Sequence, residues 1–245
     1  MERAERGERI LEAAGELLLA WGYARVTIEE IARRAKVGKG TVYLHWRTKD
    51  ALLLAVMLKA QARSQQRHVA RLRADPLEVL PSRMMRERFQ DFLDEPVLRA
   101  LYTDDSDILG RLNDHAKREC AELIAEADRA LRRHLEVLRA HGLVRTDMEV
   151  RHQQYALLAI ATGFFTAETL LDERAPDTPE TRAEILARTI RNTLETTPDP
   201  AHHTAPAATT APATVAATVA ATKIIPLYEQ LADLSAREIN RQVRR

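Results

Sequence analysis

Hydrophobic positions along the chain predict a protein built almost entirely of helices. Apolar residues recur every three or four positions across residues 3–21, which predicts a first helix there. Gly22 follows the last periodic residue, where a left-handed cap is expected. Two short helices are expected over residues 28–35 and 39–46, and a longer helix begins at Lys49.

Capping residues mark the starts of these segments. Thr27 and Glu30 have the spacing of a capping box, in which the threonine hydroxyl accepts a hydrogen bond from the backbone N–H of Glu30. Thr48 is placed to cap the helix that begins at Lys49. Two short capped helices, joined by a tight turn and packed against a third, are typical of a helix-turn-helix. Residues 1–48 are therefore predicted to form one.

Longer amphipathic segments follow and predict a larger helical domain over residues 49–196. The clearest period lies between Leu112 and Leu138, where apolar residues step by three or four. Residues 155–165 are apolar on nearly all sides, so we expect that helix to be buried between neighbouring helices or between subunits. The predicted fold class is all-α, with an N-terminal three-helix domain followed by a larger helical domain.

The composition changes abruptly after residue 196. Residues 197–222 are rich in Ala, Thr and Pro and contain little apolar bulk, which predicts a disordered linker. Residues 223–245 regain amphipathic character and predict a C-terminal helix. Its opening residues, 225–232, resemble the first helix of GntR-type regulators, although no second helix-turn-helix follows them. A helix that docks on its own dimer or on a partner, arginines that contact DNA or acidic lipid, and an unstructured tail all remain open interpretations.

Composition and charge limit the chemistry of the chain. Of the 245 residues 45% are hydrophobic and only 4% aromatic, a balance that favours helices over sheets. The formal net charge is +1, so any contact with a polyanion must come from a local patch. Cys120 is the single cysteine, which excludes an internal disulfide and a multi-cysteine metal site. The sequence shows neither a signal peptide nor a bilayer-spanning run, so we expect a cytoplasmic protein without a membrane partner.

A polar and cationic cluster lies on and beside the second short helix. A helix of this size fits the major groove of DNA, and donors around it can hold phosphates. Gly40 removes a side chain where such a helix would approach the DNA backbone. Lys49 lies in the first turn of a helix, where the dipole disfavours a cation, and a bound phosphate would explain its placement. The alternative is a solvated helical face. The cluster comprises Lys39, Thr41, Tyr43, His45 and Lys49.

Residues 9–57 resemble the N-terminal domain of the TetR/AcrR family of transcriptional regulators. The elements that carry the resemblance are Ile10-Leu11, Gly22-Tyr23, Thr27, Ile31-Ala32, Lys39-Gly-Thr-Val-Tyr43, His45 and Lys49. Two positions depart from the family pattern. Lys36 stands where the family usually has glycine, so the turn needs a strained residue or a different cap. Trp46 replaces the usual phenylalanine, a change in the core.

The resemblance implies an all-helical homodimer that binds a double-stranded DNA operator. Residues 49–196 would then form the ligand-binding and dimerisation domain, and the expected function is a ligand-responsive repressor on a near-palindromic operator. The partners implied are the operator, a small-molecule effector and a second copy of the chain, with a hinge at residues 49–68. The residues implied to hold phosphates are Thr27, Tyr43 and Lys49, and those implied to lie at or near base edges are Lys39, Gly40, Thr41 and His45.

Five aromatic residues of the larger domain are candidates for an effector pocket. Their helices are expected to face either the ligand cavity or the dimer seam, and core packing alone would also explain them, so the pocket is supported mainly by the family resemblance. The five are Phe89, Phe92, Tyr155, Phe164 and Phe165.

Other features suggest chemistry but have simpler explanations. Asp104, Asp105 and Asp107 with His115 could hold a metal, although such oxygen-rich loops more often cap helices. Cys120 lies in an apolar stripe, where a buried hydrophobe is the default and a redox sensor the alternative. No catalytic constellation or phosphate-binding loop stands out, so neither an enzyme nor a cofactor is expected. A protein-binding adaptor and a ligand-modifying enzyme remain the alternatives to a DNA-binding regulator.

Overall fold

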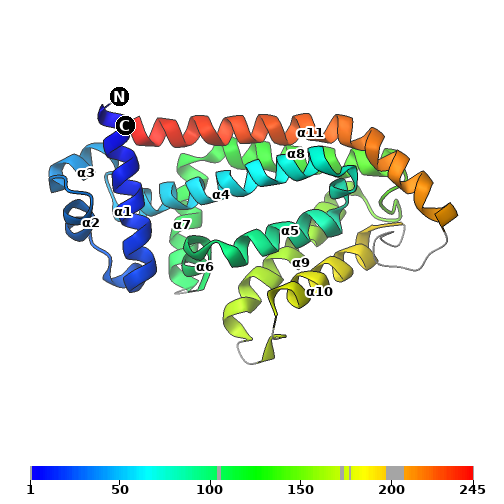
Figure 1. Cartoon of the computed structure of the whole chain (residues 1–245), viewed down its shortest axis with the longest axis horizontal. Helices are drawn as coiled ribbons and strands as arrows, with labels where there is room; N and C mark the ends of the chain where they lie inside the picture. The colour runs from blue at the N-terminus through cyan, green and yellow to red at the C-terminus, as the bar shows by residue number, and fades with distance from the viewer. Residues whose placement is uncertain (1, 104–105, 172–173, 177, 197–206, 245) are drawn as a thin grey trace. The chain divides into compact units, whose positions relative to one another are not determined.

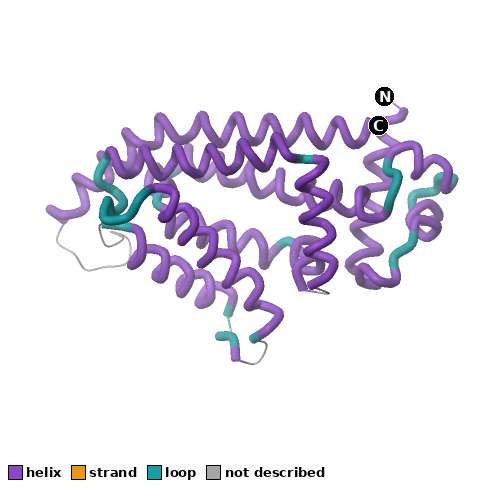
Figure 2. Tube along the Cα trace, turned by 180° about the vertical axis from the view of Figure 1, so that it is seen from behind, coloured by secondary structure: helices purple, strands orange, loops and turns teal. Residues whose placement is uncertain are grey.

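The computed structural model describes residues 2–103, 106–171, 174–176, 178–196 and 207–244. Within these ranges the chain forms eleven α-helices and one 3₁₀ helix, and Figure 2 shows no strand in them. An isolated bridge pairs Val144 with Glu195. The all-α prediction is therefore confirmed.

The helices are labelled in Figure 1. They are α1 (Glu2–Arg25), α2 (Ile28–Arg34), α3 (Lys39–His45), α4 (Lys49–Ala74), the 3₁₀ helix η1 (Pro76–Val79), α5 (Pro81–Asp94), α6 (Pro96–Thr103), α7 (Ser106–Glu119), α8 (Ala121–Ala140), α9 (Val150–Leu170), α10 (Pro179–Leu194) and α11 (Ala207–Arg244).

The chain forms two compact units that do not follow the predicted boundary between residues 48 and 49. Unit 1 comprises Met1–Arg63, Phe92–Ala125 and Ala232–Arg245, and unit 2 comprises Ser64–Asp91 and Glu126–Leu231. The first three helices belong to unit 1 together with α6 and α7. Helix α4, in which the predicted boundary falls, contributes residues to both units.

The first three helices pack on a shared apolar core within unit 1 (Figure 1). Ile10, Leu18, Ile31 and Val42 are buried there. Helix α1 also packs against α6, and a Cβ at Gly15 would lie 3.8 Å from Cγ2 of Val97. Because α1 has neighbours beyond the helix-turn-helix, the three-helix segment is not a compact unit of its own.

The turn after α2 confirms the strain expected at Lys36. Lys36 has φ 55°, and it is the one non-glycine residue with positive φ in the described ranges. The backbone N–H of Val37 donates to the carbonyl of Ala32 (3.0 Å) and that of Lys36 to the carbonyl of Arg33 (3.2 Å). This is the Schellman arrangement, which places the residue after the C-cap in a left-handed conformation. Here that residue is a lysine, so it bears a steric cost that glycine would avoid.

Gly22 also has the positive φ expected of it. Its φ is 72° and its ψ is 165°, a region that essentially only glycine adopts, rather than the left-handed helical region. Helix α1 is therefore broken at this residue, and the segment that follows it leads into Thr27.

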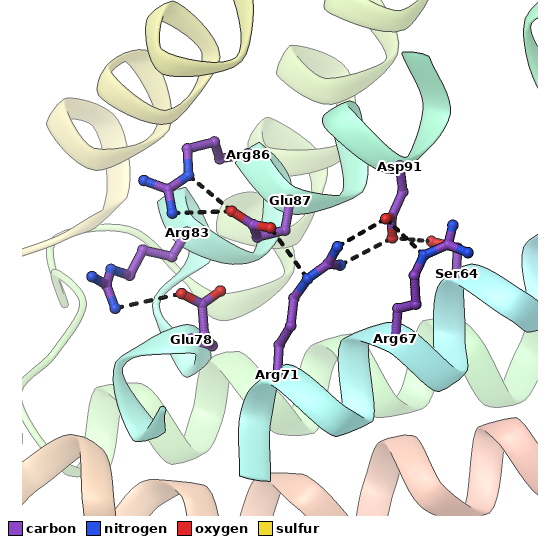
Figure 3. A network of polar contacts seen from close by, with 8 residues as sticks. All are labelled: Ser64, Arg67, Arg71, Glu78, Arg83, Arg86, Glu87 and Asp91. Carbon is purple, nitrogen blue, oxygen red and sulfur yellow. Dashed lines mark hydrogen bonds and ion pairs between the residues drawn. The ribbon is translucent and has the colours of Figure 1, made fainter. Parts of the chain in front are cut away.

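A network of charged side chains joins α4 to α5 within unit 2 (Figure 3). The carboxylate of Asp91 accepts hydrogen bonds from Oγ of Ser64 (2.9 Å) and Nε of Arg67 (2.8 Å). Arg71 donates to both carboxylate oxygens, at 3.0 and 2.9 Å. Burial opposes ionisation of Asp91, but the hydrogen bonds from Arg71, Ser64 and Arg67 bring its pKa below the ordinary value. The fully bonded carboxylate holds this part of α4 against α5.

The network continues toward η1. Nε of Arg71 lies 3.2 Å from Oε2 of Glu87. The other carboxylate oxygen of Glu87, Oε1, accepts a hydrogen bond from Arg86. Nη1 of Arg83 lies 3.4 Å from Glu78, whose pKa burial raises. The carboxylates of Glu78 and Glu87 thus offset the positive charges of Arg83 and Arg86 on α5.

Helix α11 shows that the linker prediction is wrong for residues 207–222. The helix begins at Ala207, whereas residues 197–206 lie outside the described ranges. Alanine has the highest helix propensity, and small alanines on one face allow close approach to neighbouring helices. Most of the buried positions from Ala217 to Ser235 are three or four residues apart, and the buried residues are Ala217, Ala220, Ala221, Ile224, Tyr228, Leu231, Ser235 and Gln242. The linker prediction weighed the Ala, Thr and Pro content of the segment and not the spacing of its alanines.

Tyr228 connects α11 to the interior of unit 2. Its Oη lies 2.8 Å from Nδ1 of His134 on α8, and Nε2 of His134 lies 2.7 Å from the carbonyl oxygen of Val79. A carbonyl only accepts, so we assign the proton of His134 to Nε2, and Nδ1 then accepts from the tyrosine hydroxyl. Burial lowers the pKa of His134 to about 4, which keeps the imidazole neutral at pH 7. The ring of Tyr228 also packs edge-on against His68, with centroids 4.7 Å apart.

Lys36→Gly is expected to stabilise the protein. A left-handed residue with a Cβ costs about 1–2 kcal/mol, and the greater freedom of glycine in the unfolded chain offsets roughly 0.5–1 kcal/mol of the gain. The free energy of unfolding, measured by urea denaturation, should rise by about 0.5–1 kcal/mol. Lys36→Ala is the control, because it removes the same side chain but keeps the Cβ and should give no gain. Equal stability of the two variants would contradict the assignment of strain to this residue.

Tyr228→Phe is expected to destabilise the protein by about 1–3 kcal/mol, because it leaves the buried Nδ1 of His134 without a donor. The same substitution at the exposed Tyr43, measured without DNA, is the control and should change the unfolding free energy little. Denaturant unfolding of both variants measures the difference. A Tyr228→Phe protein as stable as the control variant would show that the hydroxyl does not satisfy His134.

Candidate DNA-binding interface

The two short helices begin at the predicted residues, and each ends one residue before its predicted end. The hydroxyl of Thr27 accepts from the backbone N–H of Glu30 at 3.2 Å, so the predicted cap of α2 is confirmed. Thr48 likewise accepts from the backbone N–H of Ala51 at 3.1 Å at the start of α4. Helix α3 has no side-chain cap, and Gly38 precedes it in an extended conformation. These ends fix which residues of α3 face inward and which face outward.

The outward face of α3 carries four of the predicted site residues. Lys39, Gly40 and Tyr43 are exposed and Thr41 is half-buried. A Cβ placed on Gly40 would meet no atom within 4 Å, so the surface is open there. Nζ of Lys39 lies 5.7 Å from the ring centroid of Tyr43. The structure thus brings Lys39, Gly40, Thr41 and Tyr43 together on one short helix.

His45 does not lie on this outward face, against the expectation that it lies near base edges. His45 is only 6% exposed, and the centroid of its ring lies 5.3 Å from that of Trp46. His45 is three residues after the buried Val42, and residues three apart share a face of a helix. The spacing from Val42 is the signal in the sequence that points to this burial.

Lys49 is held by the protein itself. Its ammonium donates to the backbone carbonyls of Tyr23 (2.9 Å) and Val26 (3.1 Å) and lies 3.9 Å from the ring centroid of Tyr23. The hydroxyl of Tyr23 in turn donates to Asp50, the next residue of α4. These carbonyls, which follow the break in α1, explain the position of Lys49 without a phosphate. Sequence analysis missed Tyr23 and Asp50 as its partners because carbonyl directions after a helix break are not visible in a sequence.

Two further residues of the exposed surface escaped the sequence analysis. Leu44 on α3 is 67% exposed, although an apolar residue in a short helix is ordinarily assigned to the core. Glu29 on α2 is exposed and pairs with Lys39. Both become visible only when the facing of α2 and α3 is known.

The aromatic residues proposed for an effector pocket do not form one group. Phe89 is buried in unit 2, where its ring meets those of Phe164 and Phe165 at centroid distances of 6.3 and 5.3 Å. Phe92 is buried in unit 1. Tyr155 is 74% exposed, which does not favour an interior pocket for it and leaves the dimer seam open. Its position on the outer side of α9 points to an external contact instead.

The surroundings of Cys120 bear on its interpretation as a redox sensor. The Cys120 side chain is buried beside Glu238 (Sγ–Oε1 3.8 Å) and Gln242 (Sγ–Nε2 3.6 Å), and burial raises the pKa of its thiol to about 11. A thiol with a raised pKa is a poor redox sensor. Asp104 and Asp105 lie outside the described residues.

The described ranges contain neither a metal-binding cluster nor a helix able to span a membrane. The His, Cys, Asp and Glu side chains there form no group of three or more suited to a metal. None of the helices there combines the length and apolar character that crossing a bilayer requires.

Known proteins resemble the chain at two levels. Residues 10–56 match the model of the tetR family of bacterial regulatory proteins. An uncharacterized HTH-type transcriptional regulator, YerO of Bacillus subtilis, is 27% identical over 144 residues, which cover 58% of this chain and 49% of YerO. The chain thus spans about half the length of this curated relative.

Solved structures extend the similarity beyond the N-terminal segment. NalD, the secondary repressor of the MexAB-OprM multidrug efflux pump in Pseudomonas aeruginosa, aligns with a TM-score of 0.56 and 28% identity over 78% of this chain and 96% of NalD. FadR of Bacillus subtilis, solved with stearoyl-CoA, aligns with a TM-score of 0.55 and 16% identity over 75% of this chain and 96% of FadR, a similarity of fold. The match over residues 10–56, which contain α2 and α3, shows that this segment is a helix-turn-helix of the tetR family, and the two alignments show that the similarity of fold extends over 75–78% of the chain.

Proposed function

We propose that the chain is a repressor that binds a near-palindromic DNA operator as a homodimer and releases it when a small molecule binds the helical domain. The observation that carries this proposal is the outward face of α3, where Lys39, Gly40, Thr41 and Tyr43 lie together beside the capped start of α2. A face of this kind offers donors for phosphates and base edges on a helix that fits a major groove.

Each side chain of this face has a role that suits its chemistry. The Thr27 hydroxyl accepts from Glu30 and retains its own proton to donate to a phosphate. The Tyr43 hydroxyl is a second phosphate donor, and Lys39 and Thr41 can reach base edges. The open space over Gly40 allows close approach of the DNA backbone. Lys49 contributes by holding α1 to the start of α4, because its ammonium bonds the carbonyls of Tyr23 and Val26.

An exposed and mostly apolar stripe on α9 supports the proposed homodimer. Tyr155 and Leu158 are exposed, and Ala159 and Thr162 continue the exposed face at helical spacing. A large exposed aromatic beside a leucine is typical of a protein interface. The same stripe on a partner would bury Tyr155 in a two-fold contact, and two recognition helices about 34–36 Å apart would then match successive major grooves.

The effector step rests on known relatives and on the buried aromatic group of unit 2. NalD is a repressor, and FadR was solved with stearoyl-CoA. The clustered rings of Phe89, Phe164 and Phe165 are the apolar group that we propose lies beside such an effector. Such a ligand causes release only if it binds the DNA-incompetent state more tightly. We place the coupling in α4, because that helix contributes to both units.

Selection of binding sites from random DNA, followed by affinity measurements at several salt concentrations, tests the proposal. The expected result is a motif with two half-sites and an affinity that falls as salt rises, by about 0.9 in log K per log salt for each phosphate neutralised. Salt-independent binding, or none by a folded dimer, would favour a protein-binding adaptor instead.

Two variants sharpen the same measurement. Tyr43→Phe should weaken operator and random DNA by the same factor, about 5–10-fold, because a phosphate hydrogen bond carries no sequence information. Thr41→Ala should instead reduce discrimination at one base pair of each half-site. Identical effects of the two variants would contradict the separate roles given to them.

Tyr155→Glu is expected to dissociate the dimer, because a carboxylate would be buried at the two-fold contact. Sedimentation velocity should show a monomer, and operator affinity should fall with it. Val215→Glu is the control, since Val215 is 64% exposed on α11 of the same unit and lies off the proposed stripe. A Tyr155→Glu protein that remains dimeric would place the interface elsewhere.

A further inference from the structure

An acidic side chain lies within the cationic face of the candidate interface. Glu29, on α2, accepts a hydrogen bond from Nζ of Lys39, the first residue of α3. Both side chains are about half exposed. The hydrogen bond from Lys39 lowers the pKa of Glu29, which keeps the carboxylate ionised at neutral pH. A permanent negative charge therefore lies beside the side chains proposed to contact DNA.

The ion pair has little to do with holding the fold together. Exposed pairs of this kind contribute little to stability, because water and salt screen them. The pair does compensate an unfavourable placement, since the dipole of α3 disfavours a cation at its first residue. The ammonium of Lys39 is thus located between the carboxylate of Glu29 and the ring of Tyr43.

The location of this carboxylate changes which acceptors Lys39 can use. A lysine near DNA can bind a phosphate, which carries no sequence information, or the O6 and N7 atoms of a guanine, which do. A phosphate that approaches Lys39 also approaches the carboxylate of Glu29 and is repelled by it. A guanine edge is neutral and meets no such repulsion. Glu29 therefore disfavours the non-specific contact more than the specific one, which is how repulsive elements produce specificity.

We propose that Glu29 is a positioning residue for sequence recognition, which directs Lys39 to a guanine edge and prevents it from binding phosphate. This inference rests on the proposed DNA-binding function and adds to it a residue that does not itself need to contact a base. It predicts that removing the negative charge of Glu29 increases affinity for DNA of any sequence while decreasing discrimination.

Glu30 provides a matched control on the same helix. It accepts from Nε of Arg33 at 2.9 Å, so its ion pair lies within α2 and does not reach α3. Its place in the capping box suits glutamine as well as glutamate. Glu29→Gln and Glu30→Gln therefore make the same change in charge and size at adjacent positions, and only the first removes the partner of Lys39.

The experiment compares the full-length wild type, Glu29→Gln and Glu30→Gln by fluorescence anisotropy. The DNA probes are the selected operator, the operator with its guanines exchanged, and a scrambled duplex of equal length. Glu29→Gln should bind the scrambled duplex about 3–10-fold more tightly and steepen the salt dependence by about one phosphate. Its operator-to-scrambled affinity ratio should fall, whereas Glu30→Gln should match the wild type in ratio and salt slope.

Lys39→Gln tests whether the effect acts through the lysine. In a Lys39→Gln background, Glu29→Gln should change the affinity ratio much less than it does alone, as a double-mutant cycle would show. An unchanged ratio and salt slope in Glu29→Gln, beside a wild type that binds its operator, would overturn the inference and leave the proposed function standing. A folded wild type without salt-dependent DNA binding would overturn both.

Discussion

The candidate interface depends on the burial of the inner face of α3. This helix has seven residues, and helices of that length are not stable alone in water. Val42 and His45 on its inner face and Trp46 at its C-cap are buried, and this burial fixes the rotation of α3 about its axis. The outward direction of Lys39 and Tyr43 follows from that rotation. A change in the buried face would therefore reorient the outward side chains of α3 without altering any of them.

Backbone groups at the ends of the short helices are satisfied in ways that also set geometry. The Schellman bonds after α2 place Lys36 in a strained conformation, which shows that the turn geometry is retained at a cost. Lys49 satisfies carbonyls that follow the break at Gly22, so α1 and the start of α4 are held together by one ammonium. A cation that looked like a phosphate ligand thus has a structural role.

Charged residues serve different ends in the two units. In unit 2 the carboxylate of Asp91 is buried and accepts hydrogen bonds from Ser64, Arg67 and Arg71, so its removal would take away the acceptor of Arg67 Nε and of both Nη atoms of Arg71. In unit 1 Glu29 and Lys39 are about half exposed, so water and salt screen their pair and it contributes little to stability. The same ion-pair chemistry therefore has different energetic consequences at a buried carboxylate and at an exposed one.

The sequence by itself determined most of the helices and the resemblance of the N-terminal segment to a family of regulators. Periodicity and caps predicted the helices, since both depend on residues close in the chain: the Thr27 cap, the positive φ of Gly22 and the strain at Lys36 were all predictable. Tertiary structure decided which way side chains point. It buried His45, exposed Tyr155, gave Lys49 carbonyl partners 23 and 26 residues away, and made a helix of residues 207–222. These outcomes depend on contacts between distant segments, and no local pattern encodes the direction from which a distant helix packs.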